Sequence, residues 1–273
     1  MKNWLITGVS RGIGKALAEA ALARGDTVIG TIRRDAPQVA AGKGTFHCLR
    51  LEIRDSAAIE STVARAFELV GRLDVVVNNA AYGLLGAIED ASDAEIAHLF
   101  EVDVFGPVRL IRAVLPRLRA QRAGHIINVT SIAGRAPIAG SGIYAAAKSA
   151  MEGLSQALSQ EVGPLGIKVT AIAPGAFRTD FLSDHSIRKS GTPTGDYAAS
   201  AGKTVERLSA LSGKQLGDPA RCARAILAVV DSDKPPLHLL LGSDALRRAR
   251  EKLDAVIEEM DQWQETTLST DFH

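Results

Sequence analysis

Short apolar segments alternate with longer helical segments along most of the chain, and this alternation limits the fold more than any other feature. The apolar segments are rich in Val, Ile and Leu, as β-strands are, and the segments between them repeat apolar residues at the spacing of a helix. Strands are predicted over residues 4–7, 27–31, 45–49, 75–78, 125–130, 168–173 and 237–241. Helices are predicted over residues 14–24, 57–70, 94–121, 145–163 and 219–230.

Strands that are apolar throughout are typical of a parallel sheet covered by helices on both sides. The expected fold is therefore α/β, a doubly wound Rossmann-type parallel sheet of about seven strands with helices on both faces. No internal repeat and no Pro-rich or Ser-rich linker divides the sequence, so a single domain over residues 1–273 is expected. A further helix is expected over about residues 244–264.

One segment, residues 183–217, interrupts the alternation. It is rich in Ser, Gly and Thr and follows the sixth predicted strand. Ligands of doubly wound sheets bind beyond the carboxyl ends of the strands, so this segment is expected to form a lid over a ligand site. A surface loop without that role is the alternative interpretation.

Composition and the lengths of the apolar segments argue against several classes of binding partner. The formal net charge is +1 and only 4% of the residues are aromatic, so neither a basic field nor a base-stacking surface for nucleic acid is expected. No apolar run approaches the roughly eighteen residues of a membrane span, and the first strand begins too early for a secretory leader. Cys48 and Cys222 are read as small buried residues, and the histidines lack metal-ligand spacing. We expect a cytoplasmic protein without a metal.

A glycine-rich loop follows the first strand directly and opens the first helix. Its glycines permit a tight turn and a close approach of the backbone to a pyrophosphate at the helix N-terminus. A turn that binds no ligand is the alternative for this loop taken alone. Its spacing, Gly8-x-x-x-Gly12-x-Gly14, differs from the common dinucleotide fingerprint Gly-x-Gly-x-x-Gly.

Later motifs, taken with this loop, carry a family resemblance. They are Asn78-Asn79-Ala80-Ala81 after the fourth strand, Ser131 at the end of the fifth, Tyr144-x-x-x-Lys148 on a helix, and Pro174-Gly175-x-x-x-Thr179 after the sixth. In this order they resemble the short-chain dehydrogenase/reductase family, over about residues 2–242, although Ala81 replaces the family's glycine. The resemblance implies hydride transfer between a nicotinamide cofactor and an alcohol/carbonyl pair, with Ser131, Tyr144 and Lys148 as catalytic residues.

The spacing of Tyr144 and Lys148 also makes chemical sense without the family. Residues four apart share one face of a helix, so the Lys148 ammonium can lower the pKa of the Tyr144 phenol from its usual value of about 10 towards neutrality. An oxidised nicotinamide acts in the same direction. Tyr144 then serves as the general acid/base, and Ser131 donates a hydrogen bond to the substrate oxygen. Each of the three alone could be an ordinary structural residue.

Asp103 differs from the family pattern in a way that changes both charge and hydrogen bonding. The resemblance implies Asn at this place, whereas an ionised Asp only accepts hydrogen bonds and adds a negative charge. We expect Asp103 to act as a fourth catalytic residue, holding the water that links Lys148 to solvent and displacing the active pH range upwards. A polar helix residue without a catalytic part is the alternative.

The second strand ends without the acidic residue that usually holds the ribose of NAD. Ile32 stands at that place and Arg33 follows it; a guanidinium suits a 2′-phosphate, so NADP(H) is expected rather than NAD(H). The resemblance adds Arg11 on the phosphate side and Glu52-Ile53 against the adenine. The cofactor-binding residues so implied are Thr7, Gly8, Ser10, Arg11, Gly12, Ile13, Gly14, Arg33, Glu52, Ile53, Asn79, Ala80, Tyr144, Lys148, Pro174, Gly175, Phe177 and Thr179.

Apolar side chains are expected around the substrate, which favours a small apolar alcohol, ketone or aldehyde. The expected walls are Ile132, Ile138, Ile143, Phe177 and Phe181, with Ala81, Tyr82 and residues 183–217 above them. The alternative class is a protein that senses NADP(H) on the same fold without turnover, which Asp103 and Ala81 leave open.

Family resemblance favours a homodimer or homotetramer. The C-terminal helix is amphipathic, and Leu246, Leu253, Ile257 and Met260 lie roughly along one face of it. We expect this face to pack either on its own domain or on a partner subunit; the helix could equally block one such interface.

Overall fold

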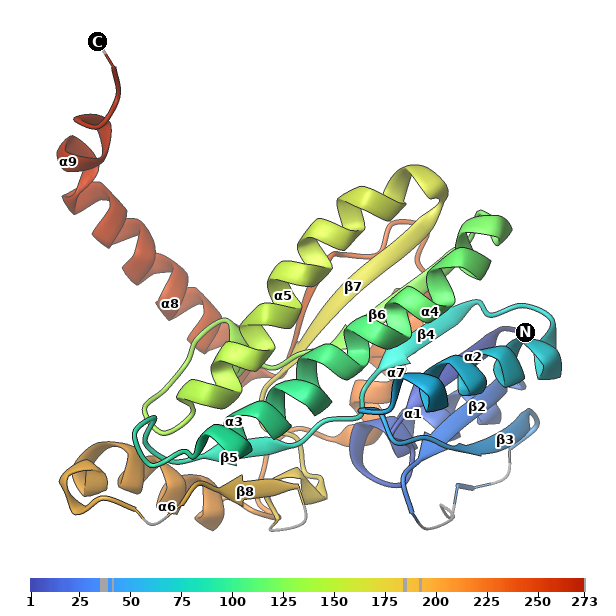
Figure 1. Cartoon of the computed structure of the whole chain (residues 1–273), viewed down its shortest axis with the longest axis horizontal. Helices are drawn as coiled ribbons and strands as arrows, with labels where there is room; N and C mark the ends of the chain where they lie inside the picture. Colours follow the sequence, from blue (N-terminus) through green and yellow to red (C-terminus); the bar gives the residue numbers. More distant parts are fainter. Residues whose placement is uncertain (35–38, 41, 184–185, 192, 273) are drawn as a thin grey trace.

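A parallel sheet of seven strands forms the centre of the computed structural model, which describes residues 1–34, 39–40, 42–183, 186–191 and 193–272. The strand order is β3-β2-β1-β4-β6-β7-β9 (Figure 1). The strands are β1 (Asn3–Thr7), β2 (Thr27–Ile32), β3 (Thr45–Arg50), β4 (Val75–Asn78), β6 (Gly124–Val129), β7 (Ile167–Pro174) and β9 (His238–Leu241). The predicted doubly wound α/β fold is confirmed, and each predicted strand is present with slightly shifted ends.

Helices cover both faces of this sheet. One face carries α1 (Gly12–Ala23) and α7 (Pro219–Asp231), and the other carries α2 (Ser56–Val70), α4 (Gly106–Gln121) and α5 (Gly142–Val162). Successive side chains of a strand point to opposite faces, so Leu5 is buried in the second of these layers, whereas Trp4 and Ile6 are buried in the first. The strands are apolar throughout because both faces are covered.

Two polar side chains hold the glycine loop against the end of β4. The Asn79 amide nitrogen donates to the backbone oxygens of Thr7 and Gly8 at 2.8 and 3.0 Å. The Thr7 hydroxyl oxygen accepts from the backbone N–H groups of Asn79 and Ala80 at 2.9 and 3.0 Å. Gly8 and Gly12 have φ angles of 73° and 61°, in the left-handed region that favours glycine. The turn after β1 therefore takes its shape from glycine and from Asn79.

The prediction of one helix over residues 94–121 is wrong. The chain forms α3 (Asp93–Phe100), then a π-helical turn at Glu101–Phe105, and then α4. A capping box between Ser92 and Glu95 begins α3. A single wide turn leaves the apolar periodicity almost unchanged, so the spacing of apolar residues does not reveal it. This turn carries Asp103, and π-helical turns often occur at functional sites.

The segment predicted as a lid contains a short strand that its composition does not reveal. Within it β8 (Ile187–Lys189) pairs in parallel with β5 (Gly83–Leu85), with Gly83 opposite Ile187. Helix α6 (Lys203–Ala210) follows and confirms the short helix that the sequence predicts near residues 203–212. Strands of three residues are too short for an alternating pattern to identify. The pairing ties this segment to the part of the chain that directly follows β4.

Helix α8 (Ser243–Gln262) projects away from the body of the molecule and is followed by α9 (Gln264–Leu268) (Figure 1). Its first two turns pack on the body, where Ala245 and Ala249 are buried with Ile132 and Ala136. The rest of α8 does not pack on its own domain. Among the described residues, no helix combines the length and the apolar character needed to cross a membrane.

The two cysteines lie in different environments, and both are free thiols. Cys222 is buried between α7 and α1, as predicted. Cys48 is exposed, which corrects the expectation that it is buried. It belongs to β3, the edge strand of the sheet, where helix cover is incomplete.

We expect Gly14→Ala to destabilise the protein. A Cβ atom added at Gly14 would overlap the Asn79 side chain and the Gly8 carbonyl oxygen, so the glycine loop must shift. Overpacking of this kind costs about 1–3 kcal/mol, which thermal unfolding followed by circular dichroism will show as a lower Tm. The matched control is Gly153→Ala in α5, where no atom lies within 4 Å of the added Cβ. Helix propensity predicts that the control gains about 0.5–1 kcal/mol, and equal effects at the two positions would contradict the role of Gly14.

Candidate active site

A cleft of about 390 Å³ opens at the carboxyl ends of the strands, where β1 and β4 are neighbours. Its walls contain the predicted catalytic residues Ser131, Tyr144 and Lys148 and every predicted cofactor residue except Gly14. Gly14 instead lies beneath the loop, against Asn79. The strand order reverses between β1 and β4, and doubly wound folds place ligand sites at such a reversal.

Tyr144, Lys148 and Ser131 form one cluster. Tyr144 and Lys148 lie one turn apart on α5 and are both buried, and the Lys148 ammonium nitrogen is 5.7 Å from the centre of the Tyr144 ring. Ser131 follows β6 and shares a hydrogen bond with the Tyr144 hydroxyl. The Ser131 hydroxyl oxygen also accepts from the Ala133 backbone N–H at 3.1 Å, which orients the hydroxyl. The residues that the motifs single out are thus brought together.

Asp103 lies behind Lys148 and outside the cleft wall. Its Oδ2 atom is 3.1 Å from the Lys148 ammonium nitrogen, and its Oδ1 atom accepts from the Tyr82 backbone N–H at 3.1 Å. Lys148 also donates to the Val129 carbonyl oxygen at 3.3 Å. Asp103 is 1% exposed, so solvent screens this ion pair very little. The two charges are therefore in direct contact, and the expected water link from Lys148 to solvent stays a prediction.

Four effects act on the pKa of Tyr144. Burial raises it above its usual value, the Lys148 ammonium lowers it, the Asp103 carboxylate raises it again, and the hydrogen bond with Ser131 lowers it. The net direction is upward, which corrects the expectation that Lys148 brings the phenol towards neutrality.

The two partners of the ion pair are also shifted. Burial raises the pKa of Asp103, and Lys148 opposes this. Burial by itself would lower the pKa of Lys148, but Asp103 and Tyr144 more than offset it, so its net shift is upward. Lys148 is therefore an ammonium ion at neutral pH.

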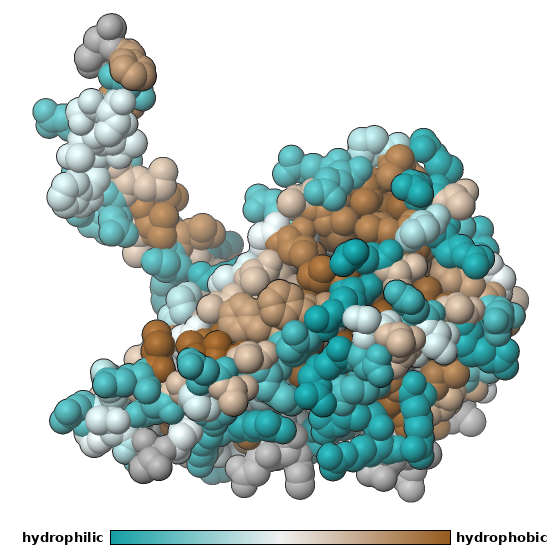
Figure 2. Space-filling model, viewed as in Figure 1, coloured by the Kyte–Doolittle hydropathy of each residue, from teal (hydrophilic) through white to brown (hydrophobic). Residues whose placement is uncertain are grey.

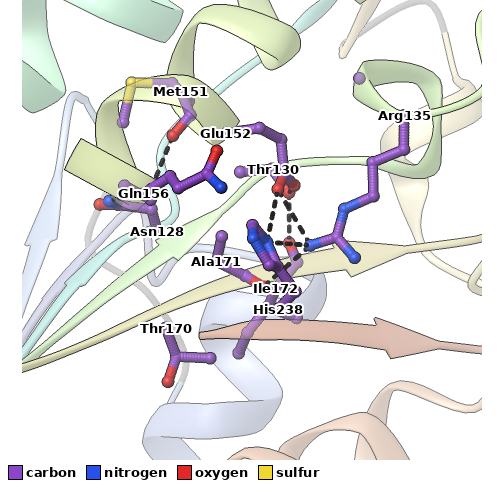
Figure 3. A network of polar contacts seen from close by, with 12 residues as sticks. Asn128, Thr130, Arg135, Met151, Glu152, Gln156, Thr170, Ala171, Ile172 and His238 are labelled. Carbon is purple, nitrogen blue, oxygen red and sulfur yellow. Dashed lines mark hydrogen bonds and ion pairs between the residues drawn. The ribbon is translucent and has the colours of Figure 1, made fainter. Parts of the chain in front are cut away.

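A second polar cluster holds the strand end that precedes Ser131 (Figure 3). The Glu152 carboxylate lies 3.0 Å from an Arg135 guanidinium nitrogen and 3.3 Å from His238 Nδ1, and it contacts the Thr130 hydroxyl. The Thr130 hydroxyl oxygen is also 2.8 Å from a carbonyl oxygen of β7. Contacts from α5 and β7 thus fix the backbone at Thr130, and with it the neighbouring Ser131.

The end of the cleft beside β2 presents Arg33. Ile32 is buried, and Arg33 is exposed at the cleft wall. The nearby Glu52 is engaged by Arg54 through side-chain hydrogen bonds of 3.0 and 3.2 Å, and this contact holds the pKa of Glu52 below its usual range. Within the described ranges no carboxylate forms an ion pair with Arg33. Its guanidinium adds positive charge to this end of the cleft and also lowers the pKa of Glu52.

The opposite end of the cleft is largely apolar. Its walls include Ala81, Tyr82, Ile132, Ile138, Phe177 and Phe181, as predicted. Ile143 is not among them, because it packs beside Tyr144 in a core cluster. β8 and α6 add Ile187, Arg188 and Leu208 to the walls. One polar pair is present, the Tyr82 hydroxyl at 2.8 Å from His98 Nδ1, and burial raises the pKa of Tyr82 to about 12.

The wall residues that sequence reasoning missed include two from the start of α8. The Asp244 carboxylate accepts from the Ala176 backbone N–H at 2.9 Å, inside the Pro-Gly motif. Arg248 donates to the Ala136 carbonyl oxygen, and burial lowers its pKa. The position of Asp244 directly after the last strand was the available signal, because all strand ends of a parallel sheet meet at one edge.

The described part of the chain contains no group of three or more His, Cys, Asp or Glu side chains arranged to hold a metal ion.

Comparison with known proteins gives matches over most of the chain. The family model described as short chain dehydrogenase matches residues 2–189. The oxidoreductase BOA17 of Botryotinia fuckeliana is 37% identical over 98% of this chain and 99% of its own length. The crystal structure of a short-chain dehydrogenase from Streptomyces avermitilis has a TM-score of 0.92 and 41% identity, covering 99% of this chain and 100% of that chain. The structure of ElxO with NADP bound has a TM-score of 0.75 and 25% identity, covering 90% of this chain and 100% of that one.

Asp103→Asn is expected to move the pH–rate profile of alcohol oxidation downwards by about one pH unit. The Asp103 carboxylate opposes ionisation of Tyr144, so without its charge the phenolate forms at lower pH. The matched control is Glu101→Gln, which removes an exposed charge from the same π-helical turn and is expected to leave the profile unchanged. Superimposable profiles for the native protein and Asp103→Asn would show that Asp103 has no part in the titration.

Proposed function

The chain belongs to the short-chain dehydrogenase/reductase family, and from this premise we propose that it is an NADP(H)-dependent oxidoreductase that interconverts an alcohol and a carbonyl compound. The observation that carries the proposal is the meeting of Ser131, Tyr144 and Lys148 in one cleft with the glycine loop. Tyr144 is the general acid/base. Ser131 binds the substrate oxygen, and Lys148 stabilises the ionised phenol.

The cleft has the features that a nicotinamide dinucleotide requires. Gly8 and Gly12 line the cleft just before α1 and have no Cβ atoms, so a ligand can approach the backbone closely there. The backbone N–H groups at the N-terminus of a helix suit a pyrophosphate. By resemblance to the family, Lys148 binds the nicotinamide ribose, and the Pro174–Thr179 motif contacts the ribose and carboxamide. The bound nicotinamide supplies or accepts the hydride.

Proton transfer falls to Tyr144. In the oxidative direction its phenolate accepts the proton of the substrate hydroxyl. The hydrogen on the carbon that bears this hydroxyl leaves as a hydride to the nicotinamide, and the carbonyl forms. In reduction the carbonyl carbon gains the hydride, and the Tyr144 phenol gives its proton to the oxygen. Ser131 donates a hydrogen bond to this oxygen in both directions and so stabilises the charge that develops there. The Lys148 ammonium favours the phenolate, against the opposing effects of burial and Asp103.

Arg33 supports the preference for NADP(H). Its side chain lies at the end of the cleft beside β2, and Ile32 replaces the acidic residue that would hold an unphosphorylated ribose. A guanidinium forms strong, charge-assisted hydrogen bonds with a phosphate. ElxO, which binds NADP, is similar to this chain over most of its length.

The substrate is a small molecule with an apolar body, either a secondary alcohol and its ketone or a primary alcohol and its aldehyde. Ile132, Ile138 and Phe181 line the end of the cleft that such a body would occupy. Residues from β8 and α6 complete this wall, so the segment over residues 183–217 acts as the substrate lid. The alternative, an NADP(H) sensor without turnover, gains its support from the buried Asp103, which opposes ionisation of Tyr144.

Replacing Tyr144 with Phe is expected to lower kcat for reduction of ketones and aldehydes by about 10²–10⁴-fold, because the proton donor is lost. Cofactor binding, measured by the fluorescence of reduced nicotinamide, should change little. The measurement is the loss of nicotinamide absorbance over a panel of carbonyl compounds. Cofactor binding without turnover in the native protein over a broad panel would support the sensor instead.

Arg33→Ala is expected to lower kcat/KM for NADPH by about 10–100-fold and to leave kcat/KM for NADH nearly unchanged, because a charge-assisted hydrogen bond contributes about 1.5–3 kcal/mol. The matched control is Arg34→Ala, since Arg34 is exposed and lies outside the cleft wall. A native preference for NADH, or equal losses with both cofactors, would refute the assignment of Arg33.

A further inference from the structure

Helix α8 presents apolar side chains to solvent. Leu253, Ile257 and Met260 are 61%, 56% and 65% exposed, and Leu246 is 44% exposed. Of the eleven strongly exposed large hydrophobic side chains among the described residues, seven lie within residues 246–272. Figure 2 shows hydrophobic residues on the projecting helix beside hydrophilic ones. A concentration of exposed apolar side chains on one element is typical of an interaction surface.

The exposed apolar residues form one stripe, and charged residues lie along its two edges. At 3.6 residues per turn, Leu246, Leu253, Ile257 and Met260 fall on one face of α8. The same geometry puts Arg250 and Asp261 along one edge of the stripe, about 50–70° from its centre. The other edge carries the small apolar residues Ala249 and Val256. Along the charged edge the basic residue comes first and the acidic residue comes second.

Charge is divided between the two halves of α8. Its four basic residues all lie between residues 247 and 252, whereas residues 254–262 carry acidic charges alone. Arg247 pairs with Glu251 within the helix at 2.8 Å. In the part of the chain that the structure describes, Arg250 and Asp261 take part in no ion pair. The two charges beside the stripe are therefore uncompensated. Because the basic residue comes first and the acidic residue second, an antiparallel second copy would place opposite charges side by side.

We propose that this stripe is a docking surface for α8 of a second copy of the chain, with the two helices antiparallel about a two-fold axis near Val256. In antiparallel helix pairs the same edge of each helix faces its counterpart. Arg250 then lies opposite Asp261 of the second copy. The symmetry forms this contact twice, as in any isologous interface. A parallel pair would instead place the charged edge of one helix against the uncharged edge of the other.

The attachment of α8 to the body favours this pairing. Ala245 and Ala249 are buried against Ile132 and Ala136, so the start of the helix is fixed on its own domain. The helix therefore projects in a defined direction before any partner binds, and less conformational freedom is lost on association. With 20 residues it is about 30 Å long, which leaves room for two domains at opposite ends of the pair.

The test is the molar mass of the full chain by light scattering after size-exclusion chromatography. The native protein is expected to assemble as a dimer or a multiple of it. Arg250→Glu and Asp261→Lys, each alone, are expected to halve the mass or to weaken association at least tenfold, because each places like charges opposite one another. The double variant Arg250→Glu/Asp261→Lys is expected to restore the native mass, because the swapped pair is again complementary. Ile257→Glu is expected to abolish the contact.

Glu258→Lys is the matched control, since it also replaces an acidic residue of α8 with lysine but lies about 130° from the centre of the stripe, and it is expected to leave the mass unchanged. The Tm of each variant separates loss of assembly from loss of folding. A native monomer at tens of micromolar, single reversals with native mass, or a double variant that is not restored would each overturn the proposal. These outcomes do not depend on turnover, so they are independent of the proposed activity.

Discussion

The parallel pairing of β1 with both β2 and β4 is the constraint on which the rest of the structure depends. The strands that follow β1 extend the sheet first to one edge, through β2 and β3, and then to the other, from β4 to β9. The cleft opens between β1 and β4, where the direction of extension changes. The glycine loop can occupy that place because Asn79 and the Thr7 hydroxyl hold it against the end of β4. The contacts of Asn79 and Thr7 therefore support both the cofactor end and the reactive end of the cleft. The strand order determines which strand ends form the walls.

Within this frame the buried pair of Lys148 and Asp103 decides the electrostatics of the reactive end. A lone ammonium in a buried site would tend to lose its proton, but the carboxylate at 3.1 Å keeps it charged. The same carboxylate opposes the charge that Tyr144 must acquire. Asp103 thus keeps Lys148 positively charged beside the phenol but also raises the pKa of Tyr144. The positive charge of an oxidised nicotinamide would act in the opposite direction and lower the pKa of Tyr144.

Much of this arrangement was predictable, since apolar runs identify buried parallel strands and the motifs at strand ends identify the cleft. Tyr144 and Lys148 were predicted to share one face of a helix, and the structure places them one turn apart on α5. The direction of the Tyr144 pKa was wrong, because burial is a property of the packed fold and cannot be read from spacing. The π-helical turn at Asp103 and the β5–β8 pairing were missed because each involves too few residues to form a period. Asp244 and Arg248 were missed because they belong to none of the motifs.

The pairing of β8 with β5 has a consequence for how substrate choice can change. Three residue pairs join the start of the lid to the strand that follows Asn79 and Ala80, so this part of the wall is built into the same backbone that supports the cofactor end. Among the described residues beyond Ser190, the next backbone pairing is at Gly217, where a bridge to Phe177 joins the segment to the Pro-Gly motif. A change in this part of the wall therefore leaves both junctions in place only if residue 217 stays glycine, because a Cβ atom added there would overlap the Phe177 ring.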